Sequence, residues 1–283
     1  MGLLLTQKIN LEHKLVKFLN LWRFSNNILK SSSSQRITLQ QTSYDLNKLK
    51  NNGKCLLIGN GPNTSEIDLN QFVGSDIDIF TCNHSYKLSC FSKLNPLLHL
   101  IIDPKIISGE WNVSMIDKIL GLTDTTHVLL DIRWYRHPLL ANYIHNHRVN
   151  WINPIYFPSA YGALPFKNIY DCYGLNVMLA SLSLASNLDY KAIAYCGMNG
   201  DGLFRQILDI PSHSFSDDKK DSATSSFYSM IESLTLHQHF MLSWAKLVEE
   251  LISNGKLVYS LNTIGLLNFN LYTDPHKFKE LPD

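Results

Sequence analysis

The sequence has no excess of charge of either sign. Its 283 residues include 25 Lys and Arg against 24 Asp and Glu, which gives a formal net charge of +1. Proteins that bind nucleic acid gather basic side chains in a patch or stripe, and the sequence contains no such cluster. We therefore exclude nucleic acid as a partner. Any phosphate group would be held locally, by backbone N–H groups and a few side chains.

The cysteines are few, and their spacing excludes a cysteine-based zinc site. The five cysteines are Cys55, Cys82, Cys90, Cys172 and Cys196, and no two of them form a C-x-x-C pair. A structural zinc site normally uses closely spaced cysteine pairs, and an odd number of cysteines cannot all form disulfides within one chain. We predict reduced, buried thiols, as in cytoplasmic proteins, and no metal site.

Long apolar runs are absent too. No stretch approaches the ~20 residues that a membrane-spanning helix needs, and the first residues do not form a signal peptide. Residues 8–30 instead show apolar positions at helical spacing and a basic polar side, followed by a serine linker at 31–34. Two interpretations stay open for this N-terminal segment, residues 1–34. The helix lies peripherally on the inner face of a membrane, or it packs on the domain or on another subunit of a homo-oligomer.

The chain does contain a regular alternation of short apolar runs and helical patterns. Apolar strands separated by helices are typical of a parallel sheet covered on both faces. We therefore predict a doubly wound α/β fold with a mostly parallel sheet over residues 50–283, interrupted by a polar, flexible lid at 208–228. The predicted strands are 54–59, 76–82, 97–102, 126–130, 190–196 and 256–261, and the predicted helices are 174–188 and 230–252.

Glycine and amide or carboxylate side chains follow the predicted strands. In an open parallel sheet, ligands bind beyond the carboxyl ends of the strands, and such a rim suits a nucleotide recognised through its base and ribose. The first loop is not the dinucleotide motif G-x-G-x-x-G, because Thr64 stands at the third glycine; a purely structural turn is the alternative. The strand-end residues are Gly59-Asn60-Gly61-Pro62, Asn83-His84, Asp103-Pro104 and the loop from Gly197 to Asp201 and Gly202.

These motifs resemble a known family. Gly59-Asn60-Gly61-Pro62, then Glu66-Ile67-Asp68 and the strand ending in Cys82-Asn83, are similar to the opening of the Campylobacter-type sialyltransferases, glycosyltransferase family 42. The flagellin-glycosylation proteins of the DUF115 type look similar as well. Later segments around Tyr173-Gly174, 189–197 and 254–259 extend the resemblance over about residues 52–265.

The resemblance implies a GT-A-like Rossmann variant and a metal-independent, inverting transferase without a cofactor. Its donor would be a CMP-activated sialic acid or related nonulosonate, and its acceptor a glycan, a glycolipid or lipopolysaccharide. The residues that would line the donor pocket are Gly59, Asn60, Gly61, Asn83, Asp103, Tyr173, Gly174 and, in the loop after the fifth strand, Asp201.

The resemblance places the catalytic base at His237, or at His239 after a small shift. Histidine has a pKa suited to taking a proton from a hydroxyl near neutral pH. Both histidines are expected at the start of a helix, where the positive end of the helix dipole favours the neutral, basic form. The alternative is that one or both are ordinary packing or surface residues.

Two departures from the family pattern keep other functions open. Tyr170 stands where the family has an arginine, and Asp201 stands where it has the first of two tyrosines that donate to the leaving phosphate. A carboxylate there would repel the phosphate, so Tyr228 or the lysines at 219 and 220 would have to replace those donors. The alternatives are a non-catalytic nucleotide- or glycan-binding relative, and a DUF115-type enzyme with another donor.

Overall fold

The computed structural model describes residues 45–155, 169–198, 200, 227–263, 265–267 and 271–281, all within the compact unit Thr42–Asp283. The predicted N-terminal helix at 8–30, the serine linker, Asp201 and residues 208–226 of the predicted lid lie outside the described residues.

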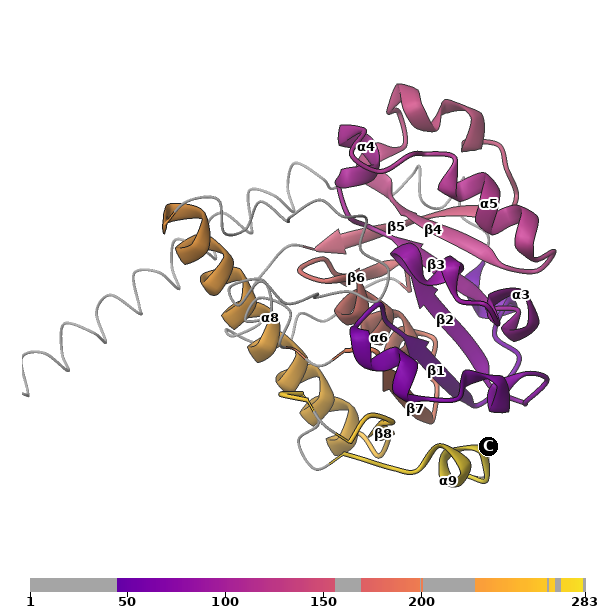
Figure 1. The fold of residues 1–283 in the computed structure, drawn as a ribbon, viewed down its shortest axis with the longest axis vertical. Coiled ribbons are helices and arrows are strands. Elements are labelled where there is room, and N and C mark those ends of the chain that lie inside the picture. Colours follow the sequence, from indigo (N-terminus) through magenta and orange to yellow (C-terminus); the bar gives the residue numbers. More distant parts are fainter. Residues whose placement is uncertain are drawn as a thin grey trace, which may run out of the picture. The chain divides into compact units, whose positions relative to one another are not determined.

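The described part of the chain forms an α/β fold around one sheet of eight strands (Figure 1). Every neighbouring pair of strands is parallel, in the order β6-β5-β4-β3-β2-β1-β7-β8. The sheet is therefore wholly parallel here rather than mostly parallel. The strands are β1 (Lys54–Ile58), β2 (Asp78–Cys82), β3 (Leu98–Ile101), β4 (His127–Asp131), β5 (Val149–Ile155), β6 (Asp171–Tyr173), β7 (Ala192–Cys196) and β8 (Leu257–Ser260).

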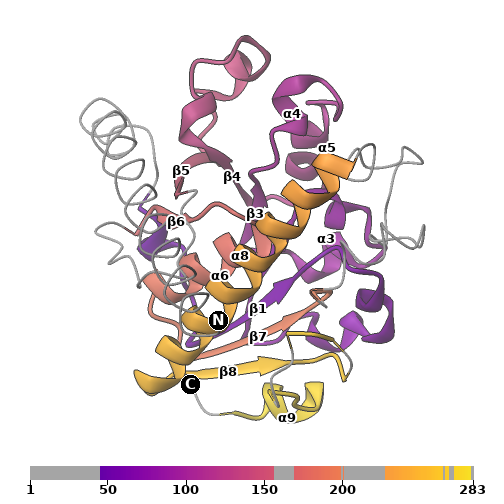
Figure 2. The ribbon, with the colours of Figure 1, turned by 90° about the vertical axis from the view of Figure 1, so that its left-hand side faces the viewer.

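Helices cover both faces of this sheet. Alternate residues of β1 point to opposite sides: Cys55 and Leu57 join a core with α6 and α8, whereas Leu56 and Ile58 join a second core with α3 and α9. Figure 2 shows α6 and α8 in front of β1 and β7. The α-helices are α3 (Phe91–Leu94), α4 (Lys105–Ser108), α5 (Met115–Leu122), α6 (Val177–Asn187), α8 (Phe227–Ser253) and α9 (Pro275–Lys279).

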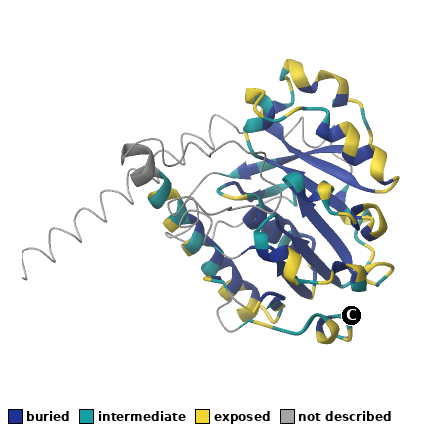
Figure 3. Cartoon of the chain, in the orientation of Figure 1, coloured by how far each residue is buried: buried dark blue, intermediate teal, exposed yellow. Residues whose placement is uncertain are grey.

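Short 3₁₀ helices fill several connections: η1 (Leu46–Lys48), η2 (Pro62–Glu66), η3 (Leu69–Phe72), η4 (Asn83–Lys87), η5 (Ile132–Trp134) and η6 (Pro138–Tyr143). The central strands are buried on both sides (Figure 3). That burial explains why they appear in the sequence as mostly apolar runs.

The sequence predicted six strands, and this count was wrong by two. β5 contains two asparagines and Pro154, which hide its apolar pattern. Inside the sheet, the Asn150 amide lies 3.0 Å from Nδ1 of His127 on β4, and Asn153 donates to Asp171 on β6 at 2.8 Å. These polar groups are paired across strands, so they are tolerated in the interior.

The long helix α8 begins at Phe227 rather than at residue 230, so residues 227 and 228 of the predicted lid are helical. The buried side of this helix faces the core. There the Trp244 ring packs edge-on against Tyr195 of β7, with ring centroids 5.0 Å apart. α8 is thereby fixed against the strand next to β1.

The five cysteines are buried and form no disulfide, as predicted. Burial raises the pKa of the Cys82 and Cys196 thiols to about 12, so both stay protonated and unreactive at neutral pH. None of the helices in the described ranges is long and apolar enough to cross a membrane.

Candidate functional site

The loops after β1 and β7 meet at the carboxyl edge of the sheet. The strand order reverses between these two strands, which is where open α/β sheets bind their ligands. Gly59 N–H donates to the Cys196 carbonyl at 2.9 Å, and Gly61 N–H donates to the Gly197 carbonyl at 2.7 Å. A Cβ atom on either glycine would lie 2.5 Å from the Gly197 oxygen.

The glycines therefore serve first to bring two loops together. The N–H groups of Gly59 and Gly61 already donate to protein carbonyls, so a phosphate would be held by other donors. Thr64 also stabilises this turn, since its hydroxyl lies 3.0 Å from the Gly59 carbonyl oxygen and 2.7 Å from the Gly61 carbonyl oxygen.

Asn262, just after β8, ties the same loops and was missed in the sequence. Its Oδ1 accepts from Gly197 N–H at 2.9 Å, and its Nδ2 donates to the Asn63 carbonyl at 2.9 Å. An amide two residues after an apolar strand was the only sequence feature that could have indicated it. Hydrogen bonds thus connect the loops that follow β1, β7 and β8.

Asn60 and Asn83 follow the neighbouring strands β1 and β2. The side-chain Oδ1 atoms of both are buried and accept no hydrogen bond within the described part of the chain. Buried polar atoms are nearly always paired, so an exception calls for an explanation. Asn83 also has a left-handed backbone, with φ of 47°, a conformation that asparagine tolerates better than most residues. Two amide carbonyls are thus available to donors of a ligand.

Three other predicted pocket residues, all within the described ranges, lie along the same edge at increasing distance from β1. Asp103 follows β3, and its carboxylate accepts from Lys105 N–H at 3.0 Å. Tyr173 ends β6, which is separated from β1 by four strands, and its side chain is buried in the core. Gly174 N–H donates to the Ile155 carbonyl at 2.9 Å. The sheet does not bring Tyr173 and Gly174 next to the Gly59 loop.

The start of α6, directly after Gly174, does return to that loop. Met178 Sδ lies 3.9 Å from Cys82 Sγ and would be 3.1 Å from a Cβ on Gly59. The N-terminus of α6 is capped by Asn176, whose Oδ1 accepts from Met178 N–H at 2.8 Å. The positive end of this helix therefore lies at the ends of β1 and β2, where it favours an anionic group.

His237 and His239 lie within α8, the eleventh and thirteenth residues of a helix that starts at Phe227. The argument from the positive helix end is therefore wrong, since that effect fades beyond the first turn. Met241 is one turn after His237 on the same side, and its Sδ would be 3.0 Å from a Cβ on Gly200, in the loop after β7. His237 thus lies about 6 Å along the helix from a contact with that loop.

His239 lies on a different side of α8, because two residues correspond to about 200° of rotation. Burial lowers its pKa, which favours the neutral ring. His237 extends the buried stripe of the helix, and its ring packs near Phe240 with centroids 6.0 Å apart. Both histidines are partly buried, but their side chains leave α8 in different directions.

Arg133, just after β4, is a strand-end cation that was missed in the sequence. Its Nε lies 3.0 and 2.9 Å from the two oxygens of Asp131, and its Nη2 completes a planar pair. The Asp131 side chain is fully buried, whereas that of Arg133 is 45% exposed. A guanidinium fixed in this way at the ligand edge can pair with a carboxylate or a phosphate.

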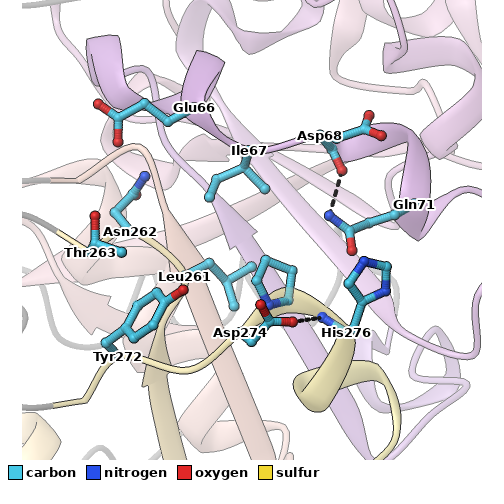
Figure 4. A pocket seen from close by; sticks show the side chains of 11 residues that line it. Glu66, Ile67, Asp68, Gln71, Leu261, Asn262, Thr263, Tyr272, Asp274 and His276 are labelled. Carbon is cyan, nitrogen blue, oxygen red and sulfur yellow. Dashed lines mark hydrogen bonds between the residues drawn. The ribbon is translucent and has the colours of Figure 1, made fainter.

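A cavity of about 260 Å³ lies on the β8 side of the switch point (Figure 4). Three carboxylates line it, those of Glu66, Asp68 and Asp274, together with His276. None of the predicted site residues lines the cavity. Its acidic walls would repel a phosphate, so it is not the nucleotide phosphate site.

Histidine, cysteine and carboxylate side chains form no group of three that could hold a metal ion within the described ranges. The nearest strand-end carboxylates on the β1 side, Asp103 and Asp131, belong to different strands, and Asp131 is already paired with Arg133.

Comparison with known proteins gives similarity in structure only. No protein-family model matches the chain, and no curated protein matches it by sequence. The sialyltransferase CstII from Campylobacter jejuni, solved with the substrate analogue CMP-3FNeuAc, is 15% identical, with a TM-score of 0.43 over 81% of this chain and 89% of that chain.

Two further structures give similar values. CST-II in complex with a trisaccharide acceptor and CMP is 16% identical, with a TM-score of 0.42 over 81% of this chain and 89% of that chain. The monofunctional alpha-2,3-sialyltransferase Cst-I from Campylobacter jejuni is 14% identical, with a TM-score of 0.43 over 83% of this chain and 84% of that chain. The chain is structurally similar to these sialyltransferases at low sequence identity, as its motifs predicted.

Proposed function

We propose that the chain binds a CMP-activated nonulosonate, such as CMP-sialic acid, and transfers the sugar with inversion to a hydroxyl of a glycan, glycolipid or lipopolysaccharide. The observation that carries this proposal is the pair of buried, unpaired carbonyl oxygens of Asn60 and Asn83 at adjacent strand ends. Such acceptors suit the amino group of cytosine and the hydroxyls of ribose. The N-terminus of α6 beside them suits the phosphate.

In the proposed reaction, His237 takes the proton of the acceptor hydroxyl. The acceptor oxygen forms a bond to the anomeric carbon as the bond to the CMP phosphate breaks, and CMP leaves with the electron pair. Arg133, held by Asp131 at the end of β4, would pair with the carboxylate that every nonulosonate carries. Asp103, Tyr173, Gly174 and Asp201 remain predicted members of the pocket.

The first test is nucleotide binding by calorimetry and thermal shift. We expect CMP to bind in preference to UMP, GDP and NAD, and Asn83→Ala to weaken CMP about tenfold or more, since a buried partner of the ligand is lost. Asn83→Gly is the matched control, because glycine adopts the left-handed backbone freely and lacks only the amide. An undiminished CMP affinity in Asn83→Gly would contradict the role of this side chain.

Metal removal is the second test. We expect EDTA to leave both CMP binding and transfer unchanged, because the strand-end carboxylates do not form the paired arrangement that holds Mg²⁺ between donor phosphates. The measurement is the transfer rate before and after dialysis against EDTA. An activity that disappears and returns with Mg²⁺ or Mn²⁺ would contradict metal independence.

The departures at Tyr170 and Asp201 favour a second candidate, a non-catalytic relative that binds the nucleotide or a glycan. Tyr170 is partly buried, burial raises its pKa, and it offers no positive charge. This candidate predicts CMP binding without donor turnover. Preference for another nucleotide in the binding panel would instead indicate an enzyme of the DUF115 type with a different donor.

A further inference from the structure

A fully buried histidine connects β3 to the turn at the end of β2. His99 lies on β3 with none of its surface exposed. Its Nε2 is 3.0 Å from the carbonyl oxygen of Asn83, and its Nδ1 is 2.8 Å from the hydroxyl of Thr81. The ring therefore spans from the body of the neighbouring strand to the residue that carries one of the unpaired amide oxygens.

The chemistry of these partners defines the protonation of the ring. A carbonyl oxygen can only accept, so Nε2 carries the proton and donates to Asn83. Nδ1 then accepts from the Thr81 hydroxyl, whose other acceptor, the Leu98 carbonyl, is farther away at 3.4 Å. Burial lowers the pKa of His99 to about 3, so the ring stays neutral and keeps this tautomer throughout the physiological range.

The hydrogen bond from His99 acts on a strained residue. Asn83 has φ of 47°, and a left-handed backbone is unfavourable for a residue with a Cβ, although asparagine adopts it more readily than most. On the other side of the turn, Cys82 N–H donates to Ser85 Oγ at 2.9 Å. Holding the Asn83 carbonyl fixes the peptide plane and thereby the direction in which its side chain leaves the backbone.

We propose that His99 is a positioning residue that holds Asn83 in the conformation in which its amide oxygen is presented to the ligand. His99 itself touches no ligand. The inference rests on the proposed function only in taking CMP as that ligand, and it predicts that a change at this buried ring weakens nucleotide binding from a distance.

Two substitutions of similar chemistry distinguish the roles of the two ring nitrogens of His99. Glutamine places an N–H at about the position of Nε2, whereas asparagine reaches only the position of Nδ1. We expect His99→Gln to keep CMP affinity within about threefold of the wild type and His99→Asn to lower it about tenfold, the worth of one lost hydrogen bond. Phe91→Leu is the stability control, because Phe91 packs edge-on against the same ring with centroids 5.8 Å apart but makes no bond to Asn83.

Equal CMP affinities in His99→Gln and His99→Asn would overturn the inference. So would a loss in Phe91→Leu as large as that in His99→Asn, because the effect would then follow from destabilised packing rather than from the bond to Asn83.

A readout without nucleotide makes the test independent of the proposed function. Long-range ¹H–¹⁵N correlation should show His99 protonated at Nε2 and unprotonated at Nδ1 between about pH 5 and pH 8. The Cα and Cβ chemical shifts of Asn83 should keep the values of a left-handed backbone in His99→Gln and change in His99→Asn. A ring that titrates in this range, or Asn83 shifts that are the same in both variants, would overturn the inference. A wild-type protein that fails to bind CMP would refute only the proposed nucleotide.

Discussion

Replacing His237 with alanine is expected to lower the rate of sugar transfer about 10²–10⁴-fold, the range of general base catalysis, while CMP still binds. The ring sits one helical turn before Met241, which contacts the loop after β7, and it is partly buried along the core-facing stripe of α8. An acceptor hydroxyl placed over the carboxyl ends of β1 and β7 would therefore lie on the side of α8 that carries His237.

His239→Ala is the matched control. It removes an imidazole two residues away, on another side of the same helix, so we expect it to retain transfer. Added imidazole should restore part of the activity of His237→Ala, because a small base can occupy the vacated space, whereas a purely structural defect would not respond. Loss of activity in His239→Ala alone would move the base to that residue. Full activity in both variants would exclude a histidine base on α8.

Much of this architecture was predictable because a strand buried on both faces of a parallel sheet appears in the sequence as a mostly apolar run. β1, β2 and β7 are mostly apolar and are followed by glycine or asparagine, so the sequence showed both the strands and the edge at which polar residues collect. β5 and β6 were missed for the opposite reason. Their asparagines and aspartate are paired across strands in the folded state, and such pairing cannot be seen in a sequence.

For the candidate site, the sequence indicated where residues lie along the strand ends but not what they contact. Asn60 and Asn83 could be placed at adjacent strand ends, but their unpaired oxygens depend on what surrounds them. Arg133 and Asn262 were missed because their importance comes from distant or buried partners, Asp131 and the loop at Gly197. The start of α8 was placed at residue 230 rather than at Phe227, and His237 lies beyond the first turn with either start.

Gly197→Ala is expected to lower the free energy of unfolding by about 3 kcal/mol or more. A Cβ at this position would be 2.1 Å from the Thr64 hydroxyl oxygen and 2.6 Å from the Gly59 carbonyl oxygen, and the residue has φ of +69°. The backbone conformation alone costs about 1–2 kcal/mol, and forcing atoms into a packed interior typically adds about 1–3 kcal/mol. Relief of the clash would require the two loops to separate, so CMP binding should fall as well.

Gly255→Ala separates strain from contact in the same protein. Gly255 also has a left-handed backbone, with φ of +78°, but a Cβ there would meet nothing within 4 Å. We expect this variant to lose only about 1–2 kcal/mol and to bind CMP normally. Urea unfolding of both variants, with CMP calorimetry on the folded proteins, gives the comparison. If the two alanine variants are equally stable, the loops after β1 and β7 are not packed as closely as their hydrogen bonds indicate. The proposed site would then lack the close junction of these loops. If Gly197→Ala is the less stable and also loses CMP, the junction of these loops supports both the fold and the nucleotide site.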